Sequence, residues 1–202
     1  NQGGAPIISN NIVMGNVATG AGGGGINLWQ SIGAWVQGNV VIGNRCITAS
    51  GGGIRATDGA AWLVNNTVAD NVSDQAGSAG GIHLETATGP FVLANNIVAY
   101  DSSGILDAGA GPEQLVNNCV FGNLAYDYSG LAAGPTDIAS DPQFVNRPAG
   151  DYHVLGTSPC VDAGADAYAP RFWSDPEGRP RILGAHVDIG AYEKPTVLVW
   201  TV

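Results

Sequence analysis

The sequence predicts an all-β protein, a right-handed parallel β-helix (solenoid) of about five coils with an irregular C-terminal cap. Two repeated motifs of one common period predict this fold. The short β-branched runs between Gly and Asn residues, with no helical periodicity, indicate that each repeat consists of strands and turns.

The first motif is a nine-residue block that occurs five times, with starts 22–30 residues apart. Each block begins with an aliphatic residue and carries Asn at position four and Val at position six. Coils of this length hold about three short strands and stack about 4.8 Å apart, so equivalent residues form columns. We expect the Val column inside and the Asn column at a sharp turn, where its amides form a ladder of hydrogen bonds and left-handed backbone angles are tolerated. The blocks are residues 8–16, 36–44, 63–71, 93–101 and 115–123.

The second motif is Gly-Ile, which lies between the blocks and recurs at residues 25–26, 53–54, 81–82 and 104–105. Because the two motifs alternate along the chain with the same period, each period is one structural unit. We therefore assign residues 1–123 to the coils and residues 124–202 to a capping segment and terminal strand of the same domain. The first block begins by residue 8, and we expect either a further upstream part or another subunit to cover this open edge.

Net charge and composition disfavour several classes of partner. The chain has 202 residues, a formal net charge of −10 and no basic stretch, which disfavours nucleic acid and anionic membranes as partners. The longest terminal apolar run, residues 196–202, is too short to cross a bilayer, so no transmembrane segment is expected. Cys46, Cys119 and Cys160 cannot all pair within one chain; we expect buried thiols, with a disulfide or a reactive thiol as alternatives.

The repeats resemble those of the pectate-lyase-like superfamily of parallel β-helix proteins. The later sequence resembles the closing segment of the bacterial choice-of-anchor Q proteins, through DPQFVN (141–146), GDYHVLGTSPCVDAG (150–164), DPEGRPR (175–181) and VDIGAYE (187–193). Cys160 departs from that pattern, in which a small apolar residue is usual. The resemblance implies an extracellular or cell-surface location and no particular reaction.

One predicted outer face follows the Gly-Ile motif. If each Ile points inward, the next residue points outward, which aligns Asn27, Arg55, His83 and Leu106, and two residues further on Trp29, Thr57, Glu85 and Ala108. Pectate-lyase-like enzymes commonly place their sites on such a face. Arg55, His83 and Glu85 are therefore the catalytic candidates. Trp29, Asn27 and Asp58 are the candidates for ligand binding, and Trp29 with Trp35 could form a sugar-stacking platform. Trp35 aligns with Trp62, and packing of these two side chains is the favoured explanation for that pair. A solvated charge pair is the alternative for Arg55 and Glu85.

A second outer face is unusually apolar. Positions five and seven of the blocks should point outward, yet they are largely aliphatic or aromatic, so another segment or a partner should cover them. We expect the C-terminal segment to do so, through Phe144, residues 187–193 or residues 196–202; a partner protein or a second copy is the alternative. The predicted interface residues are Ile12, Met14, Val40, Ile42, Ile97, Phe121 and Trp200.

The acidic residues Asp162, Asp166, Asp175, Glu177 and Asp188 lie among Arg171, Arg179 and Arg181. Because their spacing matches no calcium loop, we expect internal ion pairs and no bound metal or cofactor, with calcium as the alternative. The sequence favours a non-catalytic surface module that binds a glycan or a surface protein. Its alternatives are a polysaccharide lyase or glycoside hydrolase acting on the Gly-Ile face, and a structural subunit that self-assembles through open β-edges.

Overall fold

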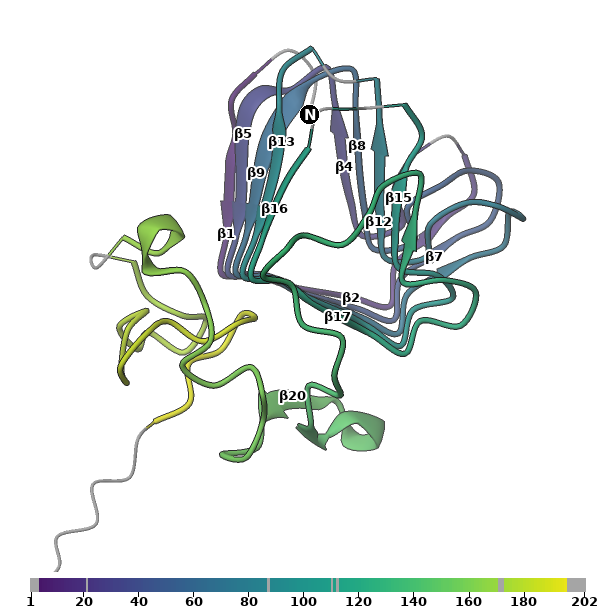
Figure 1. The fold of residues 1–202 in the computed structure, drawn as a ribbon. Coiled ribbons are helices and arrows are strands. Elements are labelled where there is room, and N and C mark those ends of the chain that lie inside the picture. Colours follow the sequence, from purple (N-terminus) through teal and green to yellow (C-terminus); the bar gives the residue numbers. More distant parts are fainter. Residues whose placement is uncertain are drawn as a thin grey trace, which may run out of the picture.

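The chain folds into a stack of parallel strands wound around one interior (Figure 1). The structure is a computed structural model and describes residues 4–20, 22–86, 88–109, 111, 113–170 and 173–195. Within these residues there are twenty short strands and two 3-10 helices, η1 (Arg147–Ala149) and η2 (Asp166–Tyr168). The predicted all-β parallel solenoid is confirmed.

Three five-stranded parallel sheets form the walls. Sheet I consists of β1 (Ile7–Ser9), β5 (Ile32–Gln37), β9 (Ala60–Val64), β13 (Phe91–Ala94) and β16 (Glu113–Val116). Sheet II consists of β2 (Ile12–Met14), β6 (Val40–Ile42), β10 (Thr67–Ala69), β14 (Ile97–Ala99) and β17 (Cys119–Phe121). Sheet III consists of β4 (Ile26–Trp29), β8 (Ile54–Thr57), β12 (Ile82–Glu85), β15 (Ile105–Asp107) and β18 (Tyr128–Ser129).

A small fourth sheet lies between sheets II and III along the chain and contains β3 (Val17–Ala18), β7 (Arg45–Cys46) and β11 (Val72–Ser73). In the described residues it has strands in three layers only. The predicted count of about five coils therefore matches the layers of the three larger sheets, whereas the complete four-stranded turns number three.

The interior is filled by columns of equivalent apolar residues, as the repeats predict. Val41, Val68 and Val98 face one another in successive layers of sheet II, and Ile54 and Ile82 do the same in sheet III. All five belong to one buried cluster. The glycines before these isoleucines are needed for close stacking, because a Cβ on Gly53 would lie 2.8 Å from the carbonyl oxygen of Gly81.

The predicted asparagine ladder is present. Asn39 Oδ1 accepts hydrogen bonds from the backbone N–H and the side-chain amide of Asn11, each at 3.0 Å. The same pair of bonds recurs along the column, from Asn39 to Asn66, Asn66 to Asn96, Asn96 to Asn118 and Asn118 to Asp137.

The left-handed turn lies one residue earlier than the sequence analysis assumed. Position three of each block has the positive φ: 56° at Asn10, 63° at Gly38, and 52–57° in the next three blocks. The expectation that the ladder residue itself adopts this conformation was wrong. The physical reason is that the turn at position three directs the position-four amide inward, where it reaches the next coil.

A second ladder had not been predicted. It runs from Asn16 to Asn44, Asn71, Asp101 and Asn123 and ends on Asp127. These residues occupy position nine of the blocks, which is Asn in four blocks and Asp in one, so the signal was present in the sequence. Each coil is thus held to the next at two corners.

The C-terminal part of the chain divides into an end cover and a flank. Tyr128 and Leu131 pack against the interior cluster, and Ile138 pairs with Cys119, so this stretch closes the last coil. The later residues, including the antiparallel pair β19 (Phe144–Asn146) and β20 (Asp151–Val154), lie against the outer side of sheet II (Figure 1).

Candidate functional site

Sheet III brings the predicted outer residues into register. Arg55 lies opposite Asn27 on one side and His83 on the other, and His83 lies opposite Leu106. The intervening Leu28, Ala56 and Leu84 are buried in the interior. Alternation along short parallel strands therefore places this column on the outer side of the sheet.

Arg55, His83 and Glu85 meet on this face. Arg55 Nη2 donates to Glu85 Oε2 at 2.8 Å, and His83 Nε2 lies 3.5 Å from the same oxygen. His83 is only 5% exposed. Burial lowers its pKa, and Glu85 opposes that effect only in part, so the imidazole is neutral at neutral pH.

Trp29 and Asp58 form the second part of the site. Trp29 is 46% exposed, and its indole Nε1 donates to Asp58 Oδ2 at 3.1 Å. Asp58 follows strand β8 in a left-handed conformation (φ 55°), which Asp tolerates, and its backbone N–H donates to the carbonyl of Glu85. This turn sets the carboxylate beside the indole.

These residues line an open pocket with a volume of about 320 Å³. Its lining residues are Asn27, Trp29, Arg55, Thr57, Asp58, Glu85 and Thr86. Thr86 also has a positive φ of 49°, which is unusual for a β-branched residue. The pocket combines an indole face with an ion pair, a carboxylate and hydroxyl groups, a set that suits the hydroxyls and apolar faces of a sugar.

The same geometry gives little support to proton transfer by His83. The imidazole does not line the pocket, and its exposure leaves little surface for a substrate. Arg55 is engaged with Glu85, and a guanidinium stays protonated in proteins. The two carboxylates of the pocket, Asp58 and Glu85, are the groups best placed to touch a ligand.

The second predicted element of a sugar platform, Trp35, lies elsewhere. Trp35 stacks on Trp62 with ring centroids 5.1 Å apart and an interplanar angle of 6°, and Trp173 packs edge-on against Trp35 at 5.4 Å. Among the described residues no ring contact joins Trp29 and Trp35. Packing across adjacent layers, the favoured prediction, explains the Trp35–Trp62 pair, and Trp29 lies on a different sheet.

The predicted interface residues on the outer side of sheet II fall into two groups. Val40, Ile42 and Ile97 are buried against the C-terminal segment, in clusters that contain Tyr152, Val154, Ile189 and Ala191. Phe121 is partly buried and packs edge-on against Tyr100. Ile12 and Met14, in the first layer, remain exposed. Trp200 lies outside the described residues.

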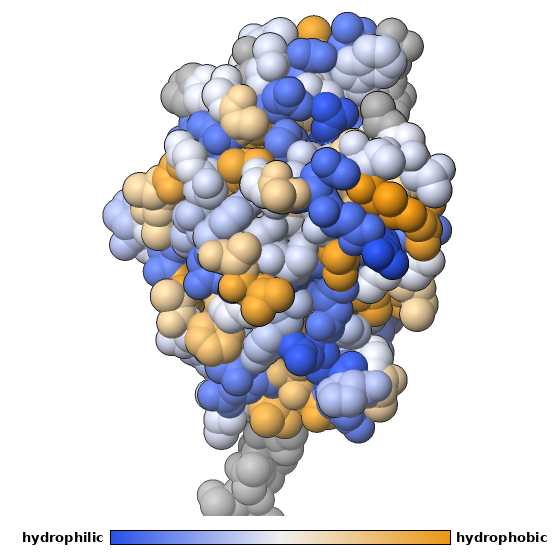
Figure 2. All heavy atoms as spheres, turned by 90° about the vertical axis from the view of Figure 1, so that its right-hand side faces the viewer, coloured by the Kyte–Doolittle hydropathy of each residue, from blue (hydrophilic) through white to orange (hydrophobic). Residues whose placement is uncertain are grey.

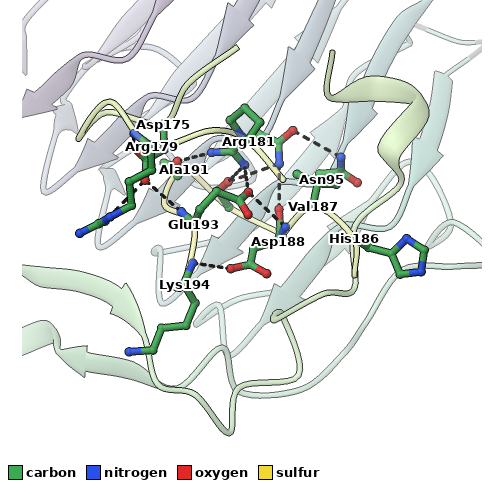
Figure 3. A network of polar contacts seen from close by, with 12 residues as sticks. Asn95, Asp175, Arg179, Arg181, His186, Val187, Asp188, Ala191, Glu193 and Lys194 are labelled. Atoms are coloured by element: carbon green, nitrogen blue, oxygen red, sulfur yellow. Dashed lines mark hydrogen bonds and ion pairs between the residues drawn. The ribbon is translucent and has the colours of Figure 1, made fainter. Parts of the chain in front are cut away.

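The acidic and basic residues of the C-terminal segment form an internal network (Figure 3). Arg181 pairs with Glu193 at 2.9 Å and donates to the carbonyls of Gly190 and Ala191. Asp175 accepts backbone hydrogen bonds from Glu177, Arg179 and Glu193. Asp188 accepts from the backbone of Asp162 and Lys194. Arg171 lies outside the described residues.

This network is buried, and its charges are perturbed accordingly. Burial raises the pKa of Glu193 and lowers the pKa of Arg181, while each partner opposes the shift of the other. Asn95 donates to and accepts from Ala165, and Gly190 donates to the carbonyl of Asn95, which ties the network to sheet II. No cluster suited to a metal ion occurs among the described residues. The arrangement is that of a structural ion pair.

A further pocket, absent from the sequence analysis, lies in this segment. His153 is held between Asp151 Oδ1 at 2.7 Å and Glu177 Oε1 at 3.3 Å, and it stacks on Tyr192 at 3.9 Å. The pocket beside it measures about 350 Å³. Asp151 and His153 lie two residues apart on β20, so the sequence could have placed them on one side of the strand. Glu177 and Tyr192 come from irregular loops, whose positions no sequence periodicity predicts.

The remaining surface offers no continuous apolar face on the side shown in Figure 2, where hydrophobic and hydrophilic residues are interspersed. Within the described part of the chain, the helices are too short to cross a bilayer.

Comparison with known proteins gives one match. The profile of a family described as disaggregatase related matches residues 113–164, well under half of the chain. No curated protein and no solved structure matches. The matched stretch begins at β16 and includes the end cover and β20, so the similarity to that family covers the last coil and the segment after it. The resemblance to the choice-of-anchor Q proteins stays a prediction.

Proposed function

We propose that this β-helix is an extracellular, non-catalytic module that binds a neutral glycan in the pocket of sheet III. The observation that carries the proposal is the half-exposed Trp29 ring, fixed by Asp58 beside the Arg55–Glu85 pair. An indole fixed by a hydrogen bond offers a rigid apolar face at small entropic cost, and the neighbouring polar groups match sugar hydroxyls.

The negative net charge of the chain favours a neutral glycan over a polyanionic one. A net charge of −10 repels a polyanionic chain, whereas a neutral glycan meets no such penalty. The match to the disaggregatase related family lies outside the pocket, because it covers residues 113–164 and the lining residues fall between Asn27 and Thr86. The family match therefore supports the architecture, and the pocket alone supports the ligand.

The test is titration of neutral oligosaccharides from a glycan array, followed by calorimetry. We expect Trp29→Ala to weaken binding at least about tenfold, the loss of a ring contact of roughly 1.4 kcal/mol. Leu124→Ala is the control, because Leu124 is an exposed apolar residue that does not line the pocket. Unchanged affinity in Trp29→Ala, or equal loss in both variants, would refute the proposal.

A glycoside hydrolase is the second candidate, because Asp58 and Glu85 place two carboxylates on one pocket, the residue types that such enzymes use. Release of reducing ends from the bound glycan, abolished by Asp58→Asn and by Glu85→Gln, would replace the binding module with this enzyme. Unsaturated products would instead indicate a lyase. Binding without any product supports the module.

A further candidate is a structural subunit of a surface assembly. The exposed apolar residues of the first layer, among them Ile12 and Met14, favour it, since isolated β-edges with apolar side chains promote association. Large species in light scattering without added glycan would support this function. Extracellular location is tested by fractionation of the producing cells.

A further inference from the structure

Two cysteines meet where the C-terminal segment covers sheet II. Cys119 lies on β17, in the outward column and opposite Ile97. Cys160 comes from the C-terminal segment. Both are fully buried, and both belong to one cluster with Ile97, Val154 and Ile189. The two thiols thus stand on opposite sides of the contact between the β-helix and its flank.

Their shared cluster brings the two side chains together from separate parts of the chain. Hydrogen bonding to Cys160 is the largest of the influences that raise the pKa of the Cys119 thiol, ahead of burial. Cys119 Sγ also lies 3.2 Å from the carbonyl oxygen of Ser140. Both groups are free thiols here. A disulfide can form only where two cysteine side chains already approach each other, and these two lie in one buried cluster.

Cys46 provides the internal comparison. It is equally buried, but it lies on β7 in the small sheet and bonds through Sγ to the carbonyl of Gly22 at 3.1 Å. It is not a member of the cluster that holds Cys119 and Cys160. All three cysteines are buried, so burial does not distinguish Cys119 and Cys160 from Cys46. What distinguishes them is that they lie in the same cluster.

We propose that Cys119 and Cys160 form a disulfide that links the C-terminal segment to the β-helix when the protein is exposed to an oxidising disulfide. The exchange balances with oxidised glutathione. One cysteine thiolate attacks the glutathione disulfide and releases one glutathione thiol. The second cysteine thiolate then attacks the resulting mixed disulfide and releases the other. Two protons leave the protein, the cysteines are oxidised, and one glutathione disulfide is reduced to two thiols.

The structure predicts how the bond forms and what it does. Buried thiols are slow to ionise, so exchange proceeds during folding or local opening of the segment and not from the closed surface. The bond closes a loop of roughly 40 residues, which lowers the entropy of the unfolded chain. We expect the thermal midpoint of the oxidised protein to exceed that of the reduced protein by roughly 5–15 °C.

The experiment refolds the full chain with a glutathione redox pair and compares it with the chain refolded in a phosphine reductant. Intact mass should fall by two hydrogens, and peptide mapping should recover the 119–160 cross-link. Cys46→Ser should behave as wild type. Cys119→Ser and Cys160→Ser should lose both the mass change and the reductant-sensitive rise in thermal midpoint.

Failure of a variant to fold does not remove the test, because alkylation and mapping of the wild-type chain are sufficient. A cross-link that involves Cys46, or full alkylation of Cys119 and Cys160 after oxidative refolding, would overturn the proposal. Neither outcome depends on glycan binding, so the disulfide stands or falls separately from the pocket of sheet III.

Discussion

At the scale of single residues, the side-chain amides of the ladders carry an unusual share of the contacts between coils. Asn66 Oδ1 accepts two bonds from Asn39, and its Nδ2 donates to Asn96 Oδ1 and to the carbonyl of Val36. Asn66 is fully buried. One side chain therefore satisfies polar groups in three successive layers, and water has no access to replace it.

We expect Asn66→Ala to lower the free energy of unfolding by about 3–5 kcal/mol, because several buried donors and acceptors lose their partner. Asn11→Ala is the matched control. Asn11 is an exposed member of the same ladder. Its side-chain amide donates to Asn39 and to the carbonyl of Ser9, but its Oδ1 accepts no bond among the described residues. Its replacement should cost about 1 kcal/mol. Urea denaturation measures both values, and equal losses would contradict the asymmetry.

His83 predicts a pH dependence of stability. Its folded pKa lies below the ordinary value of about 6.5, chiefly because of burial. The unfolded chain therefore takes up the proton first as the pH falls. The stability gained from burying the neutral ring is fully present above about pH 6.5 and is lost as the pH drops from there through the folded pKa.

The measurement is the free energy of unfolding between about pH 7.5 and pH 5. His83→Gln should make this profile flatter than that of the wild type. His186→Gln is the control, because the His186 side chain is largely exposed, and it should leave the slope nearly unchanged. A slope that persists in His83→Gln would show that another group titrates in this range.

At the scale of elements, the layer in which a strand lies decides what its outward residues do. Ile97 in β14 is 1% exposed beneath the C-terminal segment, whereas Ile12, at the equivalent position in β2, is 58% exposed. The two positions have the same block alignment, so the sequence gives them the same prediction. Only the path of the C-terminal segment over sheet II separates them.

Ile97→Lys should therefore destabilise the protein by about 3–5 kcal/mol, since it places an unpaired charge in an apolar contact. Ile12→Lys should change stability by less than about 0.5 kcal/mol. Thermal unfolding provides the comparison. If Ile97→Lys folded with wild-type stability, the contact between the segment and sheet II would have to be loose, and its role as a cover would fail.

The sequence predicted the contacts that recur in every coil, and it could not predict the contacts that occur only once. Period-two alternation sufficed to place Ile54, Val68 and Arg55 on their sides of the sheets, because register repeats in every layer. Two contacts depend on irregular segments that do not repeat along the chain. They are the contact of Cys119 with Cys160 and that of His153 with Glu177. Such contacts have no period, and composition does not encode the path that brings them together.

Even within the repeat, burial was not fully predictable. His83 and Arg55 follow the same outward rule, yet Arg55 lines the pocket, whereas His83 is 5% exposed and does not. Alternation specifies the face on which a side chain lies. The exposed fraction of that side chain also depends on the sizes of all its neighbours in adjacent layers.

At the scale of the whole molecule, the two ends of the solenoid differ. At the C-terminal end the ladders finish on the carboxylates of Asp137 and Asp127, and Leu131 packs against the interior. At the opposite end, strands β1 and β2 pair on one side only within the described residues. At the covered end β17 has a further bridge to Ile138, whereas β16 and β18 each pair with one strand only in the described part of the chain.

The open end is also apolar. Ile7, Ile12, Met14 and Val17 are all among the exposed large hydrophobic residues of the described chain. Exposed strand edges that carry apolar side chains are a template for pairing with another chain. We therefore expect this chain to associate in a concentration-dependent manner through β1 and β2, with the covered end taking no part.

Size-exclusion chromatography with light scattering across a hundredfold range of concentration measures this. Ile12→Lys combined with Val17→Lys should shift the protein to a monomer, because like charges facing across the paired edges repel and the apolar contact is lost. Leu124→Lys combined with Leu155→Lys adds the same charge at exposed apolar sites outside the first layer and should leave association unchanged. If both double variants dissociate alike, net charge and not the edge controls assembly. If the unsubstituted chain is a monomer at every concentration, the open edge does not pair with a second copy, and the structural-subunit function loses the observation that favours it.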